Sequence, residues 1–216
     1  MPINSQTKDE SATEPRWLAL IAVLAAGLVY GALPNSLSAG PHWLLLAVIA
    51  PVSVSALISH RVGHHTADKV MGYAASGILT IAMTWSLGLL VAAIPQHTID
   101  PKSLLRSAVA LWVTNILVFA LWYWRLDAGG PHKREGVPGH KKGAFLFPQM
   151  NLEANADSDW SPNFVDYLFL AFNTSTALSP TDTAALSRWA KILMMVQATI
   201  SLAVVALLAA RAVNVL

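Results

Sequence analysis

Residues 107–124 read SAVALWVTNILVFALWYW and contain no charged side chain. A helix needs about 20 apolar residues to cross the hydrocarbon core of a bilayer, with roughly 17 to 25 tolerated. Further segments of this kind are residues 17–33, 43–59, 70–94 and 189–210. Their continuous apolar character favours helices over barrel strands, because backbone groups in lipid must be hydrogen-bonded within their own segment. The sequence therefore predicts an all-α integral membrane protein with five transmembrane helices.

The composition of the whole chain supports this class. Of the 216 residues, 55% are hydrophobic and 12% are charged, whereas soluble domains carry roughly 25% charged residues. The net charge of +2 is too small for a surface that follows nucleic-acid phosphates, and we expect no nucleic-acid partner. The absence of cysteine excludes disulfides, thiolate metal sites and a cysteine nucleophile. Enzyme signatures are also absent, so we expect no enzymatic activity, no cofactor and no metal.

The connection between the last two apolar segments contains an apolar run that is too short to cross a membrane. A polar stretch, residues 125–160, precedes the apolar run Phe164–Phe172. Ser161 is a candidate N-cap and Pro162 suits the first helical position, which predicts a helix of about ten residues that dips into the bilayer or lies on it. A polar turn, residues 173–182, then leads to the last span. Short helix, polar turn and long helix together form the layout of a re-entrant pore loop.

Residues 167–216 resemble the pore half of the potassium-channel superfamily, which has an outer helix, a pore helix, a filter loop and an inner helix. The ungapped match is to the filter pattern TLTTVGYGD of that family. Thr174, Thr176 and Asp182 match, and Leu178 takes the place of the filter valine. The pattern FVDYLFLAF, followed by TD and SRWAK, is also similar to an uncharacterised family of predicted bacterial membrane proteins. That resemblance implies the bacterial cytoplasmic membrane as the location.

The loop departs from the family at the positions that set selectivity. Ser179 and Thr181 replace the two filter glycines, and Pro180 replaces the tyrosine. Potassium selection uses backbone carbonyls turned toward the ion, and a Cβ or a proline ring disfavours that backbone geometry. We therefore expect a poorly selective cation path, or a loop that does not conduct. An alternative needs no ion: Ser179, Pro180 and Asp182 fit the N-cap, N1 and N3 positions of a helix start.

The lysines and arginines predict an orientation that conflicts with the resemblance. One side receives Lys8, Arg16, Arg61, Lys69, Arg125, Lys133, Arg134, Lys141 and Lys142, and the other receives Lys102, Arg106 and Arg211. The positive-inside rule then places the N-terminus and the long connection in the cytoplasm. In the potassium-channel family, by contrast, the pore loop enters from outside.

These observations give a domain plan and two hypotheses of function. The plan has a polar tail, residues 1–16, a three-helix membrane region, residues 17–103, and a pore-like module, residues 104–216. The first hypothesis is an oligomeric channel, tetrameric as the resemblance implies, that passes monovalent cations. The second is a non-conducting structural or interaction protein that docks lipid or a partner through its basic loop.

Each hypothesis has its candidate residues. The filter-like loop comprises Thr174, Ser175, Thr176, Ala177, Leu178, Ser179, Pro180, Thr181 and Asp182. Gln197 and Ser201 are expected to face an inner cavity, although interhelical hydrogen bonding is the commoner role of polar groups within spans. Membrane lipids or a partner would contact Lys133, Arg134, Lys141 and Lys142.

Overall fold

The computed structural model describes residues 16–38, 40–41, 43–61, 65–96, 100–134, 143–151, 160–177 and 182–215. Most of these residues are helical. The α-helices are α1 (Trp17–Gly31), α2 (Leu44–Arg61), α3 (His65–Gln96), α4 (Pro101–Leu126), α5 (Pro131–Arg134), α6 (Phe164–Thr176) and α7 (Arg188–Val215). Short 3-10 turns are η1 (Asn35–Leu37), η2 (Asp127–Gly129) and η3 (Pro148–Asn151), and two short strands, β1 (Phe145–Leu146) and β2 (Ala184–Ala185), pair antiparallel.

Three helical segments are long and apolar enough to cross a membrane: Thr66–Ala93, Pro101–Gly129 and Arg188–Ala210. They indicate an integral membrane protein, and they confirm the all-α class. The segments Trp17–Gly31 and Leu44–Ser59 are apolar but shorter. Length and composition therefore support three spanning helices among the described residues rather than the five expected from the sequence.

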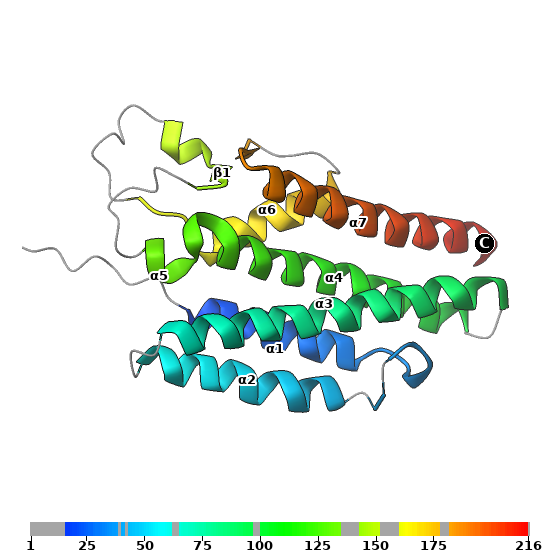
Figure 1. Ribbon diagram of the computed structural model, residues 1–216. Helices are drawn as coiled ribbons and strands as arrows, with labels where there is room; N and C mark the ends of the chain where they lie inside the picture. Colours follow the sequence, from blue (N-terminus) through cyan, green and yellow to red (C-terminus); the bar gives the residue numbers. More distant parts are fainter. Residues whose placement is uncertain are drawn as a thin grey trace, which may run out of the picture.

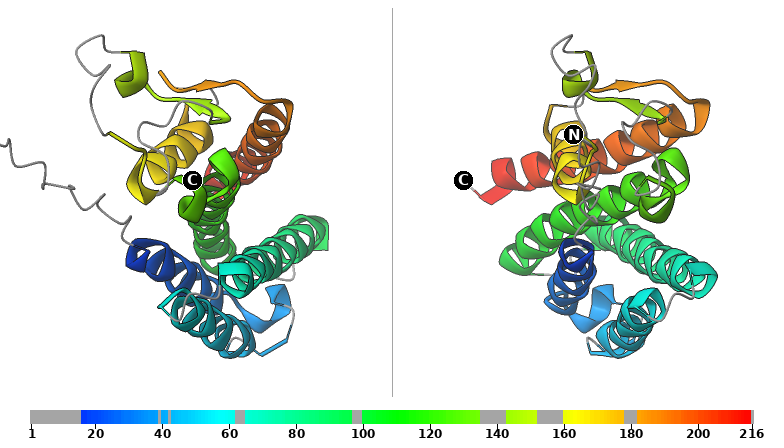
Figure 2. Two further views of the ribbon diagram at one scale, coloured as in Figure 1. Left: turned by 60° about the vertical axis from the view of Figure 1, so that its left-hand side comes forward. Right: turned by 90° about the vertical axis from the view of Figure 1, so that its left-hand side faces the viewer.

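Helix α4 lies at the centre of the molecule, with α1, α2 and α3 on one side and α6 and α7 on the other (Figures 1 and 2). It contacts α1, α3, α6 and α7. Of the three long helices, α4 is the most buried and α7 the least. The core consequently follows the length of α4, while much of the α7 surface stays uncovered.

The local chemistry explains the lengths and spacing of these helices. The Asp100 side chain caps α4 by accepting a hydrogen bond from the backbone N–H of Ser103, and Pro101 occupies the first turn. Helix α4 therefore begins six residues before the predicted start at residue 107. Gly27 allows α1 and α2 to approach closely, because a Cβ there would lie 2.5 Å from the Cδ1 of Ile49.

Candidate functional site

The predicted short helix exists as α6, but its cap differs from the expectation. The side chain of Asn163, not Ser161, caps the helix by accepting a hydrogen bond from the N–H of Val165 at 2.8 Å. Asp166 completes a capping box, because its carboxylate accepts from the N–H of Asn163 at 2.8 Å. Asn163 has extended backbone angles, so the residues before it lie outside the helix and Ser161 cannot cap it.

Aromatic contacts fix where α6 begins. The ring of Phe164 packs edge-on against Trp124 near the end of α4, with 5.9 Å between centroids. Phe145 of β1 packs against Tyr123 at 5.2 Å and against Trp189 in the first turn of α7 at 5.9 Å. The end of α4 and the starts of α6 and α7 therefore lie at the same end of the bundle (Figure 1).

A buried polar network holds α6 between α4 and α7. The Nε2 of Gln197 donates to the carbonyl of Ala171 at 2.7 Å and to the Oγ of Ser175 at 2.8 Å. The Oε1 of Gln197 accepts from the hydroxyl of Tyr123 at 2.5 Å. The Oγ of Ser201 donates to the carbonyl of Ser175 at 2.6 Å. These bonds join the interior faces of all three helices.

Asn115 of α4 belongs to the same network. Its Nδ2 donates to the Oγ of Ser175 at 3.4 Å and to the carbonyl of Gln197 at 3.3 Å. Its buried Oδ1 receives no hydrogen bond from any described residue. Trp112 extends the network outward by donating from Nε1 to the Oγ of Ser201 at 3.1 Å.

The hydrogen bonds to α7 show how far α6 reaches into the bundle. Ser201, which bonds the carbonyl of Ser175, lies 13 residues after Arg188, the first residue of α7. At 1.5 Å per residue this distance is about 20 Å, and it equals the length of the 13-residue α6. Helix α6 thus runs into the bundle beside α7 for about 20 Å.

The chain then returns to the end from which α6 started. Strand β2 pairs with β1, with Ala185 opposite Phe145, and the N–H of Leu186 donates to the carbonyl of Ala144 at 2.7 Å. Helix α7 starts at Arg188, and the Oγ of Ser187 accepts from the N–H of Ala190 at 3.2 Å. Helix α6 therefore runs into the bundle, β2 lies back at the end where α6 starts, and α7 runs along the bundle from that end. We call the described residues 163–177 and 182–210 the re-entrant hairpin, because the chain enters the bundle and is back at the same end before α7 begins.

The helix-start interpretation is wrong at Asp182, and its other two residues, Ser179 and Pro180, lie outside the described part of the chain. Asp182 and the residues after it as far as Ser187 are not helical, and two of them form β2. The observed cap of α7 is Ser187, eight residues after the predicted one. Asp182 itself is exposed.

The structure separates the candidate loop residues into three groups. Thr174 and Ser175 lie in the last helical turns of α6 and are buried, so the polar turn begins later than predicted and neither side chain can line an open path. Thr176 and Ala177 are exposed at the inner end of α6. Residues 178–181 lie outside the described part of the chain.

Gln197 and Ser201, which were expected to face an inner cavity, lie elsewhere. Gln197 and Ser201 are each 0% exposed, and their side chains bond α6 and α4. They do not face a cavity. Interhelical hydrogen bonding, the commoner role of such residues, is what the structure shows.

Arg134, a predicted lipid or partner contact, is instead a structural residue. Its Nη1 donates to the carbonyls of Trp124 at 2.8 Å and Asp127 at 3.0 Å, and its guanidinium lies 5.1 Å from the centre of the Tyr167 ring. Lys133 is exposed. Lys141 and Lys142 lie outside the described residues.

Asp127, which no sequence pattern singled out, ties the hairpin to α4. Asp127 is fully buried, and its carboxylate accepts from the hydroxyl of Tyr167 at 2.6 Å and from the backbone N–H of Ala144. The sequence DAGG after α4 indicates a tight turn at this place, because glycine readily adopts positive φ. In the structure Ala128, Gly129 and Gly130 all take positive φ. That turn directs the carboxylate inward rather than into solvent.

Comparisons of the chain with known protein families, with curated proteins and with solved structures gave no match. Within the described residues, no group of three or more His, Cys, Asp or Glu side chains is placed to hold a metal ion. The re-entrant hairpin and the charges around it are therefore the features from which a function can be argued.

Proposed function

We propose that this chain is a channel-like membrane protein of the pore-loop type that assembles as a homo-oligomer and passes cations with little selectivity. The observation that carries the proposal is the re-entrant hairpin. Helix α6 starts beside the first turn of α7, ends about 20 Å further in, and is followed by a return to the starting end. Pore loops place a short helix and an ion-facing turn in the membrane in this way.

Exposed apolar side chains on the hairpin support assembly. Val165, Phe169 and Phe172 follow one face of α6 and are 52%, 61% and 45% exposed. The outer face of α7 likewise exposes Ile192 and Met195. Because one hairpin cannot surround an ion path, these faces are the natural contacts between neighbouring copies. In this arrangement the shorter helices α1 and α2 cross the membrane with α3, which gives five spans.

The exposed end of α6 supplies the candidate constriction. Thr176 and Ala177 are exposed there, and the next residues are those that replace the filter glycines and tyrosine. Thr176 presents a hydroxyl, and Asp182 supplies negative charge where the chain returns. Hydroxyl and carboxylate groups attract cations without the fixed carbonyl rows that potassium selection requires.

The basic residues support one orientation of the hairpin. Arg125 and Lys133 lie at the end where α6 starts, and Arg188 and Lys191 stand in the first turn of α7 at that same end. Lys102 occupies the opposite end of α4. By the positive-inside rule the hairpin enters from the cytoplasmic side, which is the reverse of the potassium-channel family.

Cation flux into proteoliposomes containing the purified protein tests the proposal. We expect flux above that of empty liposomes, and about a tenfold loss of flux in Thr176→Val, because that change removes an exposed hydroxyl from the constriction. Thr199→Val is the matched control, because Thr199 is exposed on α7 and its hydroxyl donates to the Met195 carbonyl of its own helix. Protein that gives no flux with any monovalent cation over a range of pH would contradict the proposal.

A second candidate function is a non-conducting structural or interaction protein. The observation that favours it is the closed contact between α4, α6 and α7, in which Gln197 and Ser201 each donate a hydrogen bond to Ser175 instead of facing an open path. The oligomeric state separates the two candidates. A symmetric oligomer, which the channel proposal expects to be a tetramer, accords with the channel. A monomer without flux accords with the second candidate.

A further inference from the structure

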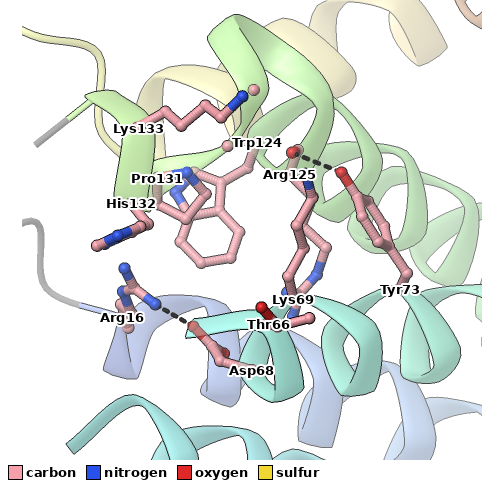
Figure 3. Close-up of a pocket in the computed structure, with 12 residues that line it drawn as sticks. Arg16, Thr66, Asp68, Lys69, Tyr73, Trp124, Arg125, Pro131, His132 and Lys133 are labelled. Carbon is pink, nitrogen blue, oxygen red and sulfur yellow. Dashed lines mark hydrogen bonds and ion pairs between the residues drawn. The ribbon is translucent and has the colours of Figure 1, made fainter. Parts of the chain in front are cut away.

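A cavity of about 370 Å³ lies at the basic end of the bundle, outside the re-entrant hairpin (Figure 3). Its walls come from the start of α1, the first turns of α3, the end of α4 and the turn that leads into α5. The volume falls within the range of small-ligand pockets, which is roughly 300 to 1,000 Å³. The cavity is therefore large enough for a small organic anion.

The charges around this cavity are mostly positive. Arg16, Lys69, Arg125 and Lys133 line it, and Asp68 is the carboxylate among the lining residues. Asp68 forms an ion pair with Arg16, as Figure 3 shows. Lys69 and Lys133 are exposed and lie on different helices, α3 and α5. Among the described residues, cations from four elements thus line one space, and Asp68 is the carboxylate beside them.

Arg125 is packed into the cavity wall. Its guanidinium lies against α3 at Gly72, where a Cβ would collide with Nη1. It also lies 5.2 Å from the centre of the Trp124 ring. The Nε atom is buried and has no hydrogen-bond acceptor among the described residues. A buried donor without an acceptor is costly, so the guanidinium of Arg125, which lines the cavity, keeps hydrogen-bonding capacity that the described residues do not use.

We infer that this cavity binds a phosphate group, carried either by the headgroup of an anionic phospholipid or by a soluble phosphoester. Several cations that converge from different elements suit the multiple oxygens of a phosphate, and the guanidinium of Arg125 has the planar geometry that pairs with them. The rings of Trp124 and Tyr73 and the ring of Pro131 supply apolar walls for the carbon part of either ligand. The inference does not depend on conduction by the hairpin.

The experiment uses the full chain in nanodiscs and has two arms. In the first, inorganic phosphate is titrated calorimetrically into protein held in phosphatidylcholine nanodiscs. In the second, native mass spectrometry counts phosphatidylglycerol retained by protein from mixed phosphatidylcholine and phosphatidylglycerol nanodiscs. The test variant is the double substitution Lys69→Gln with Lys133→Gln, because both side chains are exposed and neither should be needed for folding. Lys191→Gln is the control, since Lys191 is exposed on α7 outside the cavity.

We expect the double variant to weaken binding roughly 25-fold, which is about fivefold for each lysine, and Lys191→Gln to change it less than twofold. Retention of phosphatidylglycerol without binding of phosphate identifies a lipid headgroup, and the reverse identifies a soluble phosphoester. If neither phosphate nor phosphatidylglycerol binds, the inference is overturned. Weakening of about fivefold by Lys191→Gln, which is the share expected of each cavity lysine, also overturns it, because the attraction would then be that of the whole basic end.

Discussion

At the scale of single residues, Gln197 joins the hairpin to the rest of the bundle. It donates to Ala171 and Ser175 of α6 and accepts from Tyr123 of α4. The sequence identified Gln197 as a polar group within a span, but it could not distinguish a cavity from a helix contact. That distinction depends on which face of α6 meets α7, and the apolar pattern of α7 does not define one face.

Gln197→Leu should therefore destabilise the protein by about 2 kcal/mol, because it removes three hydrogen bonds and leaves the Tyr123 hydroxyl without its acceptor. Thr199→Val, two residues away and exposed, should change stability little. Unfolding of both variants in mixed micelles, followed by circular dichroism, measures the difference. Equal stability of the two variants would show that the network does not hold the hairpin.

Arg134 and Lys133 are adjacent in sequence but have different roles. Arg134→Ala should cost about 2 kcal/mol, because it removes charged hydrogen bonds to two carbonyls at the end of α4. Lys133→Ala should leave stability unchanged, because Lys133 is exposed. The same unfolding assay compares them. A neutral Arg134→Ala would indicate a surface role for this arginine, as the sequence first suggested.

At the scale of elements, the long apolar helices were predictable and the ends of the hairpin were not. The runs of residues 70–94, 107–124 and 189–210 identified α3, α4 and α7, because unbroken apolar sequence has few other structures available in lipid. Helix α6 was also predicted, but its cap was placed at Ser161 instead of Asn163. Several residues before Phe164 can cap a helix, and the choice depends on the contact of Phe164 with Trp124, which is distant in sequence.

The capping box of α6 gives a direct test of this assignment. Asn163→Ala should cost about 1 kcal/mol, because the N–H of Val165 loses its acceptor. Ser161→Ala should have no such cost, since Ser161 precedes the capping residue and is exposed. Thermal unfolding of the two variants in detergent checks the pair. A larger loss of stability in Ser161→Ala than in Asn163→Ala would show that Ser161 caps α6, as expected from the sequence.

At the scale of the whole molecule, the charges define two unlike ends. Arg16, Lys69, Arg125 and Lys133 meet in space around one cavity, although they are far apart in the sequence. The positive-inside rule grouped these residues correctly without any knowledge of their contacts. The resemblance to the potassium-channel superfamily suggested the hairpin, but it implies entry from the opposite side of the membrane. The structure shows that the hairpin starts at the basic end.

Single-cysteine labelling with a membrane-impermeant maleimide tests the re-entrant hairpin most directly, since the native chain contains no cysteine. The variants are Ser161→Cys before α6, Leu186→Cys before α7 and Thr176→Cys at the inner end of α6, with Lys133→Cys and Lys102→Cys as markers of the two ends of the bundle. We expect Ser161→Cys and Leu186→Cys to label from the same side as Lys133→Cys, and Lys102→Cys to label from the other side. Thr176→Cys should label from the side of Lys133→Cys but more slowly than Ser161→Cys, because it lies about 20 Å further in. Labelling of Ser161→Cys and Leu186→Cys from opposite sides, or equally fast labelling of Thr176→Cys and Ser161→Cys, would contradict a hairpin that enters and leaves the membrane at one face.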